Sequence, residues 1–330
     1  MSEEAGDLSC VLAGVRLRNP LVLASGIWGT SPDLLERAAR SGAGAVTAKT
    51  CTLEPRRGHR NPSAVDWGGG LINAMGLPNP GAKEETLLLK QAKRALAPLG
   101  VALIASVSAD TPEGFAEAAT LVAQAEPDLI ELNMSCPNVK DDCGVIFAGS
   151  AGATYAATAA AAGATRIPLL VKLAPNVPSV AEIARAAKDA GARGLTVINT
   201  MPGMLIDAEA CQPVLANRSG GISGPALKPI ALRCVYEAAD AVDLPIIGTG
   251  GVINGTDAVE MLMAGAEAVG IGTAIEYRGQ DALTQILKEL SAWMSAHQVR
   301  RLSEIRGKAH EAAHRPAPTN PPPVPGWSHA

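Results

Sequence analysis

Aromatic residues are scarce in this chain of 330 residues: Phe, Trp and Tyr make up 3% of it, whereas 47% is hydrophobic. The core must therefore be built from Ala, Val, Ile and Leu, which is typical of parallel sheets covered by helices. An excess of one charge is also missing. The net charge is −4 with acids and bases interspersed, and this argues against a nucleic-acid-binding or membrane-binding surface.

Long hydrophobic runs are absent too. The N-terminal stretch MSEEAGDLSC lacks the basic start and apolar run of a signal peptide. The most apolar helix that we expect, over 151–164, is mostly Ala and Thr and is too short to span a bilayer. We therefore expect a soluble, cytoplasmic protein.

Cysteine pairs with metal-ligand spacing are missing as well. The six cysteines stand at positions 10, 51, 136, 143, 211 and 234, and none forms a C-x2-C pair or the C-x4-C-x2-C pattern of an iron–sulfur site. We expect no metal site in this chain. Each cysteine is most simply a small core residue, and only Cys136 has neighbours that argue otherwise.

Short apolar runs alternate with helical stretches along the whole chain. They predict eight strands, at 21–24, 45–49, 102–107, 129–133, 169–173, 195–199, 245–248 and 268–272. Helix starts are indicated by Ser31-Pro32, by Thr111-Pro112 and by a capping box from Ser179 to Glu182. Eight such units predict an α/β fold of the (β/α)8 TIM barrel type, with a doubly wound sheet as the alternative.

The predicted barrel domain covers residues 1–306. Residues 51–83 are rich in Gly, Pro and Asn and predict a long loop over the barrel mouth, and 307–330 predict a proline-rich tail. The pattern HEAAH at 310–314 matches a zinc-binding motif. It has no third ligand or predicted strand beside it, so a solvated terminal helix is the simpler interpretation.

Polar residues and glycines stand at the carboxyl ends of the predicted strands, where barrels carry their active sites. Lys49 and Lys172 are notable because a buried ammonium is costly unless it is paired. We expect them to meet an anionic ligand, although a structural ion pair is the alternative. The stretches GTGG (248–251) and GIGTA (270–274) end the last two strands, where barrels bind phosphate groups.

Four asparagines, Asn73, Asn133, Asn138 and Asn199, fall at the same predicted mouth. A carboxamide both donates and accepts hydrogen bonds, which suits a planar heterocycle with alternating C=O and N–H groups. Asparagine is also common in turns, so a single one indicates little, and only the four together favour ligand binding.

Across nearly its whole length the sequence resembles the class 1 dihydroorotate dehydrogenases. The resemblance is carried by NPLVLASG (19–26), TAKTCTLEPRRGHRNP (47–62), INAMGLPNPG (72–81), ELNMSCPN (131–138), LLVKLAPN (169–176), the long run at 197–229, IIGTGGV (246–252) and AVGIGTA (268–274). The cysteine of SCPN is typical of class 1, and GGISGPALKP (220–229) resembles class 1B. The chain departs from class 1B at 139–150, VKDDCGVIFAGS, and has Ser106 where the family often has Asn.

The resemblance implies two sets of binding residues. FMN would contact Ser25, Lys49, Thr50, Asn133, Lys172, Ile198, Gly224, Gly250, Gly251, Gly272 and Thr273. Dihydroorotate or orotate would contact Lys49, Asn73, Ala74, Met75, Gly76, Leu77, Asn133, Asn138, Asn199 and Thr200.

The implied reaction oxidises dihydroorotate to orotate in pyrimidine biosynthesis. Cys136 would be the catalytic base that takes the C5 proton, FMN would accept the C6 hydride, and Lys172 would stabilise the charge of the reduced flavin. Class 1B membership further implies a homodimer joined in a heterotetramer by a subunit that carries FAD and a [2Fe-2S] cluster and reduces NAD.

Two alternatives remain open from the sequence. One is oxidation or reduction of another pyrimidine at C5–C6, as in dihydropyrimidine dehydrogenases, which carry a similar cysteine loop. The other is a phosphate-binding barrel without redox chemistry, such as an aldolase-type lyase that uses Lys172 as a Schiff-base nucleophile.

Overall fold

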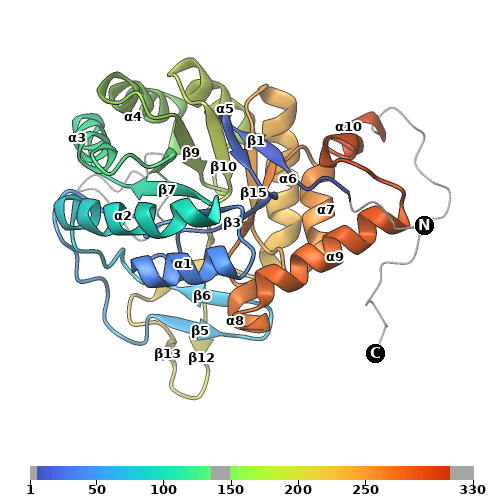
Figure 1. Ribbon diagram of the computed structural model, residues 1–330. Coiled ribbons are helices and arrows are strands. Elements are labelled where there is room, and N and C mark those ends of the chain that lie inside the picture. The colour runs from blue at the N-terminus through green and yellow to red at the C-terminus, as the bar shows by residue number, and fades with distance from the viewer. Residues whose placement is uncertain (1–5, 135–148, 313–330) are drawn as a thin grey trace.

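A closed parallel barrel forms the centre of the computed structural model, which describes residues 6–134 and 149–312 (Figure 1). The strands follow one another around the barrel in chain order, and the last one pairs with the first. They are β3 (Leu21–Leu23), β4 (Ala45–Thr47), β7 (Ala102–Val107), β8 (Leu129–Asn133), β9 (Leu169–Leu173), β10 (Gly194–Val197), β15 (Ile246–Thr249) and β16 (Ala268–Ile271). The predicted TIM barrel is confirmed, and the doubly wound alternative is wrong.

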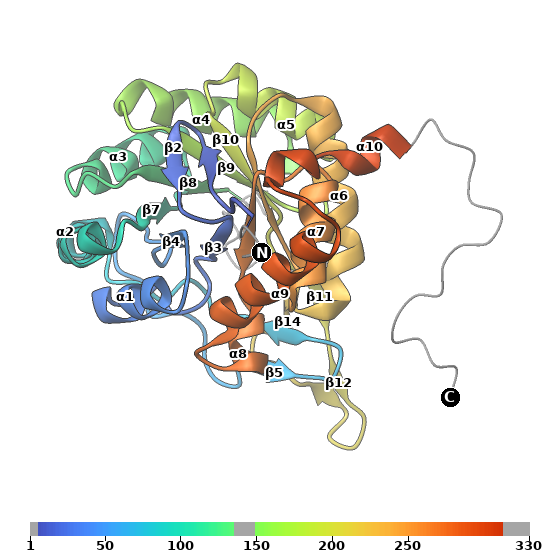
Figure 2. The same cartoon turned by 45° about the vertical axis from the view of Figure 1, so that its right-hand side comes forward.

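Helices surround the barrel and cover its outer face (Figures 1 and 2). They are α1 (Pro32–Arg40), α2 (Ala82–Leu96), α3 (Pro112–Ala123), α4 (Ala151–Ala164), α5 (Val180–Asp189), α6 (Lys228–Ala241), α7 (Gly255–Met263), α8 (Ala274–Arg278), α9 (Ala282–Ala296) and α10 (Lys308–Ala312). Among the described residues, none of the helices combines the length and the apolar character that crossing a bilayer would require.

Strand residues alternate between two separate cores, as the two-residue period of a strand requires. Ile130 and Leu132 of β8 belong to the large core between strands and helices. Leu129 faces the barrel interior and packs in a second core with Leu12 and Leu17. These two residues come from the hairpin of β1 (Cys10–Leu12) and β2 (Val15–Leu17), so the hairpin closes the end of the barrel at which the strands begin.

A second sheet, antiparallel, lies beside the barrel, in the lower part of Figures 1 and 2. Its strands in order are β11 (Met201–Met204), β14 (Ser219–Ser223), β6 (Leu71–Asn73) and β5 (Ala64–Asp66), and the short hairpin β12 (Ile206–Asp207) and β13 (Gln212–Pro213) extends from it. The expected loop at 51–83 therefore contains two strands. Strand β6 pairs with residues 219–223, far away in the sequence, and β5 pairs with β6.

Several predicted boundaries need correction. Strands β4 and β10 end at Thr47 and Val197, two residues earlier than expected, because their chains leave the ladder to enter loops at the barrel mouth. The helix starts at Ser31, Thr111 and Ser179 are confirmed by side-chain caps. Ser179 accepts a bond from the Glu182 N–H, whereas both halves of a capping box are present in α7, formed by Asn254 and Asp257.

The helix of the HEAAH pattern packs against the barrel instead of lying free in solvent. His310 stacks on Tyr236, with ring centroids 3.8 Å apart, and its Nε2 lies 3.1 Å from the Ala264 carbonyl oxygen. Residue 314 lies outside the described residues. The boundary that the sequence predicts between a barrel domain and a tail at 306/307 stays a prediction.

Candidate active site

One cavity of about 360 Å³ opens at the carboxyl ends of the barrel strands. Its walls come from the loops after the barrel strands and from the antiparallel sheet, which contributes Ala64, Leu71, Asn73 and Ser223. The volume is within the range of roughly 300–1,000 Å³ that small-molecule sites occupy. The cavity is therefore the candidate site for the ligand that the sequence predicts.

The structure brings the predicted site residues together around this cavity. Its lining includes Ser25, Lys49, Thr50, Asn73, Met75, Gly76, Leu77, Asn133, Lys172, Ile198, Asn199, Thr200, Gly224, Gly250, Gly251, Gly272 and Thr273. Ala74 is the exception among the described ones: its side chain is fully buried, and it is not part of the lining. Cys136 and Asn138 lie outside the described residues.

The buried ammonium of Lys172 has a partner within the protein. Its Nζ lies 3.9 Å from Oε1 of Glu131 and donates to the Ser25 hydroxyl at 3.3 Å. Both side chains of the ion pair are less than a tenth exposed. Lys172 thus lines the cavity and also forms the structural ion pair that the sequence left as an alternative.

Hydrogen bonds join the neighbouring polar side chains into one network. The Thr50 and Ser106 hydroxyls lie 2.9 Å apart, and the Asn133 carboxamide donates to Thr50 at 3.0 Å. Asn199 donates to the Asn133 oxygen at 3.4 Å and accepts from the backbone N–H of Thr200. These bonds fix which atoms of the carboxamides face the cavity, because a bonded amide cannot turn freely.

Glycines leave room on the side of β15 and β16. A side chain at Gly272 would meet only the Ala24 Cβ, at 3.8 Å, so the space in front of it is open. Gly250 and Gly251 have φ angles of 134° and 75°, which side-chain-bearing residues rarely adopt. The nearby Thr249 hydroxyl is buried without a hydrogen-bond partner in the described structure. An open backbone cradle with a spare hydroxyl fits a phosphate group and an adjoining flat ring.

The loop between β15 and α7 is held from behind. Asp257 accepts from Lys228 Nζ at 2.6 Å and from the backbone N–H groups of Ile253 and Asn254 at 2.8 and 3.1 Å. Arg278 donates to the Ile253 carbonyl at 3.0 Å. The glycine cradle, formed by Gly250, Gly251 and Gly272, is therefore held in place by these bonds before any ligand binds.

Sequence reasoning missed several residues of the site. Trp28, Ser223 and Thr249 line the cavity, and Glu131 and Thr196 lie inside the barrel, bonded to each other at 2.9 Å. The position of Glu131, two residues before Asn133 on the same strand, is a signal that could have found it. Ser106, which stands where the family often has Asn, bonds to Thr50 and Glu131 and is not part of the cavity lining.

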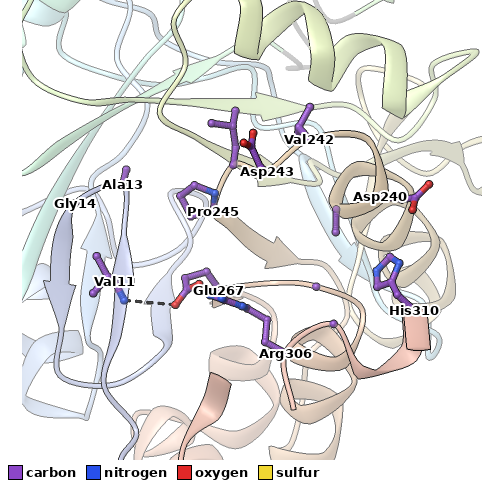
Figure 3. A pocket seen from close by; sticks show the side chains of 14 residues that line it. Val11, Ala13, Gly14, Asp240, Val242, Asp243, Pro245, Glu267, Arg306 and His310 are labelled. Atoms are coloured by element: carbon purple, nitrogen blue, oxygen red, sulfur yellow. Dashed lines mark hydrogen bonds and ion pairs between the residues drawn. The ribbon is translucent and has the colours of Figure 1, made fainter. Parts of the chain in front are cut away.

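A larger cavity, about 710 Å³, lies at the opposite end of the barrel, where the strands begin (Figure 3). Two of its acidic side chains form ion pairs, Glu267 with Arg306 and Asp243 with Lys188. It lies between the β1–β2 hairpin and the loops that lead into β15 and β16. This end of a barrel serves stability, and the cavity contains none of the predicted site residues.

Comparisons with known proteins agree on the family. A family profile described as Dihydroorotate dehydrogenase matches residues 7–294. Proteins named "Dihydroorotate dehydrogenase B (NAD(+)), catalytic subunit" are similar over most of the chain. The one from Methanothermobacter thermautotrophicus is 44% identical, covering 92% of this chain and 99% of that protein, and the one from Methanocaldococcus jannaschii is 42% identical, covering 91% and 97%. The crystal structure of DHODH in complex with ferulenol from Eimeria tenella has the same fold, with a TM-score of 0.81 at 22% identity, over 94% of this chain and 89% of that one.

Proposed function

The chain belongs to the dihydroorotate dehydrogenase family, and from this premise we propose that it is the catalytic subunit of an NAD-linked enzyme that oxidises dihydroorotate to orotate. The observation that carries the proposal is the single cavity at the barrel mouth, which collects the predicted residues of the described chain apart from Ala74. Family membership also argues against the phosphate-binding lyase. In addition, Lys172 is engaged in an ion pair and is poorly suited as a free amine nucleophile.

FMN fits the cavity by the chemistry of its walls. Gly250, Gly251 and Gly272 line the cavity, with open space in front of Gly272, and offer backbone for its phosphate. The hydroxyl of Thr249, which has no partner in the described structure, belongs to the same wall. Lys172 and Ser25 would face the ring system. When bound, FMN supplies the hydride acceptor that the reaction needs.

The substrate is held by the hydrogen-bonded carboxamides. Asn73, Asn133 and Asn199 line the cavity together with Lys49, and this set matches a pyrimidine edge plus a carboxylate. Because the network fixes Asn133 and Asn199 before binding, the ordering cost of positioning the substrate is already met in the free protein. The alternative substrate, another pyrimidine, lacks the carboxylate that Lys49 would bind.

Cys136 is the proposed base, although it lies outside the described residues. In the sequence it follows the last residue of β8, Asn133, by three positions, and Asn133 lines the cavity. A thiolate there takes the C5 proton. We expect Cys136→Ala to retain bound FMN and lose most of its turnover, with Cys136→Ser as the matched variant that keeps a weaker base. Near-normal turnover in the alanine variant would mean that another group takes the proton.

Electrons leave this chain through a partner in the proposal. The relatives named above are catalytic subunits of an NAD-linked enzyme, and we infer a second subunit with FAD and a [2Fe-2S] cluster. We further propose that two copies of this chain form a homodimer within a heterotetramer, and that the enzyme is cytoplasmic. Co-purification with an iron–sulfur flavoprotein would support the partner, and robust activity of the isolated chain with fumarate would contradict it.

Anaerobic titration of the purified protein tests the function directly. Addition of dihydroorotate should bleach the flavin absorbance stoichiometrically. Dihydrouracil, which has the ring without the carboxylate, is the matched control and should leave the absorbance unchanged. Equal bleaching by the two compounds would favour the other pyrimidine oxidoreductase, and a colourless protein that binds no FMN would refute both.

A further inference from the structure

Glu131 is a charged side chain at the centre of the barrel that the proposed chemistry does not use. It is 2% exposed, and it is not part of the cavity lining. In β8 it occupies the level between two other residues that face the barrel interior: Leu129, in the apolar core below, and Asn133, on the cavity above. A carboxylate at this depth is costly and persists only with compensating partners.

Its partners come from three neighbouring strands. Oε1 accepts from the Ser106 hydroxyl of β7 at 3.0 Å, and Oε2 accepts from the Thr196 hydroxyl of β10 at 2.9 Å. The ammonium of Lys172 in β9 lies 3.9 Å from Oε1. The two hydroxyls hold both oxygens of the carboxylate in place, so its charge has a fixed position beneath Lys172.

Lys172 stands between this carboxylate and the cavity. The lysine contacts Glu131 on the inner side, and it lines the cavity on the other side. The cations that line the cavity in the described chain are Lys49 and Lys172. Glu131 therefore lowers the positive charge of the cavity floor by one unit and fixes the direction from which Lys172 acts.

We propose that Glu131 sets the reduction potential of FMN through its charge, which is held beneath Lys172 and opposes the field of that lysine at the flavin. This inference rests on the proposed function, because it concerns FMN bound in the cavity. Reduction by two electrons gives the flavin a negative charge. A nearby cation stabilises this charge and a nearby anion destabilises it. With Glu131 in place, FMN has a lower potential than Lys172 alone would give it, which favours passing electrons onward to NAD.

The test measures the midpoint potential of FMN in the loaded protein by anaerobic titration with redox dyes. Glu131→Gln removes the charge at nearly constant shape and should raise the potential. Lys172→Met should lower it, and the double variant should lie between the two single ones. Glu131→Asp keeps the charge and should stay near the wild-type value. Thr196→Val removes one hydrogen bond to Glu131 without changing any charge, so it should lower thermal stability and leave the potential unchanged.

The outcomes separate this inference from the proposed function. A wild-type protein that binds no FMN, or whose flavin dihydroorotate fails to bleach, overturns the proposed function. A wild-type protein that dihydroorotate reduces, together with equal potentials for the wild type and Glu131→Gln, overturns only the role of Glu131. If Glu131→Gln does not fold, the double variant against Lys172→Met gives the same comparison, because there both charges are gone. A double variant with the potential of Lys172→Met would overturn the inference.

Discussion

Replacing Asp257 by alanine should loosen the glycine cradle and lower the stability of the protein. The 6% exposed carboxylate bonds to Lys228 and to the backbone N–H groups of Ile253 and Asn254. Lys228 keeps a second partner, Glu260, at 2.8 Å, and Asn254 is exposed enough for water to replace its lost bond. Since bonds to a charged group contribute roughly 1.5–3 kcal/mol each and part is recovered, the free energy of unfolding should fall by about 3 kcal/mol.

The assay is thermal unfolding of the protein with and without FMN. An unfolding entropy of roughly 2.1 cal/mol/K per residue converts 3 kcal/mol into a fall of about 4–5 °C in Tm for a chain of this size. FMN must then order the loop itself, so its Kd should rise about tenfold, which corresponds to roughly 1.4 kcal/mol. Glu260→Ala is the matched control, because it leaves the bonds of Asp257 intact. A Tm within about 1 °C of the wild type, or an equal loss in the control, would refute the reasoning.

Three other outcomes are expected. Burial raises the pKa of Glu85 to about 7 from 4.5, because the folded protein favours the protonated carboxyl. The stability that this preference gives is fully present below pH 4.5 and is lost as the pH rises to about 7. Relative to the wild type, the free energy of unfolding of Glu85→Gln should therefore rise by up to roughly 3 kcal/mol between pH 5 and pH 8. Thermal unfolding at both pH values measures this, and Glu84→Gln, at an exposed position, is the control that should show no such rise. Lys172→Met should slow flavin reduction by dihydroorotate in stopped-flow experiments, and an unchanged rate would contradict its electrostatic role. Gly221→Ala would place a Cβ 2.0 Å from the Thr200 Oγ1, so it should weaken orotate binding in a titration and cost about 1–3 kcal/mol of stability.

The barrel could be predicted because each strand carries its own signal. Runs such as 102–107 and 129–133 are mostly apolar, and both strands have the predicted bounds. The antiparallel sheet carries no such signal. Strand β6 pairs with β14 at Asn73 and Gly221, and this pairing joins segments that are far apart in the chain. Local pattern cannot reveal it, because short strands with Gly and Asn resemble loops until their partners are known.

The candidate site was predictable to the extent that its residues stand at strand ends. Lys49, Asn133 and Lys172 are polar residues next to apolar strands, and parallel strands bring such ends together. Glu131 is not among the predicted site residues, because an acidic residue inside an apolar run gives no local sign of the partners that compensate it. The two-residue period of the strand puts it inside the barrel, where Thr196 and Lys172 compensate its charge.

Depth along a single strand separates stability from binding in this barrel. On β8, Leu129 belongs to the apolar plug, Glu131 to the ion-pair layer and Asn133 to the cavity wall. Leu129 is separated from the cavity by the two levels above it, whereas Asn133 lines the cavity. The middle layer belongs to both, because its charges must be balanced for the barrel to fold and their field reaches the cavity. A change of charge at Glu131 therefore alters both stability and the environment of the ligand, whereas a substitution of Leu129 alters stability alone.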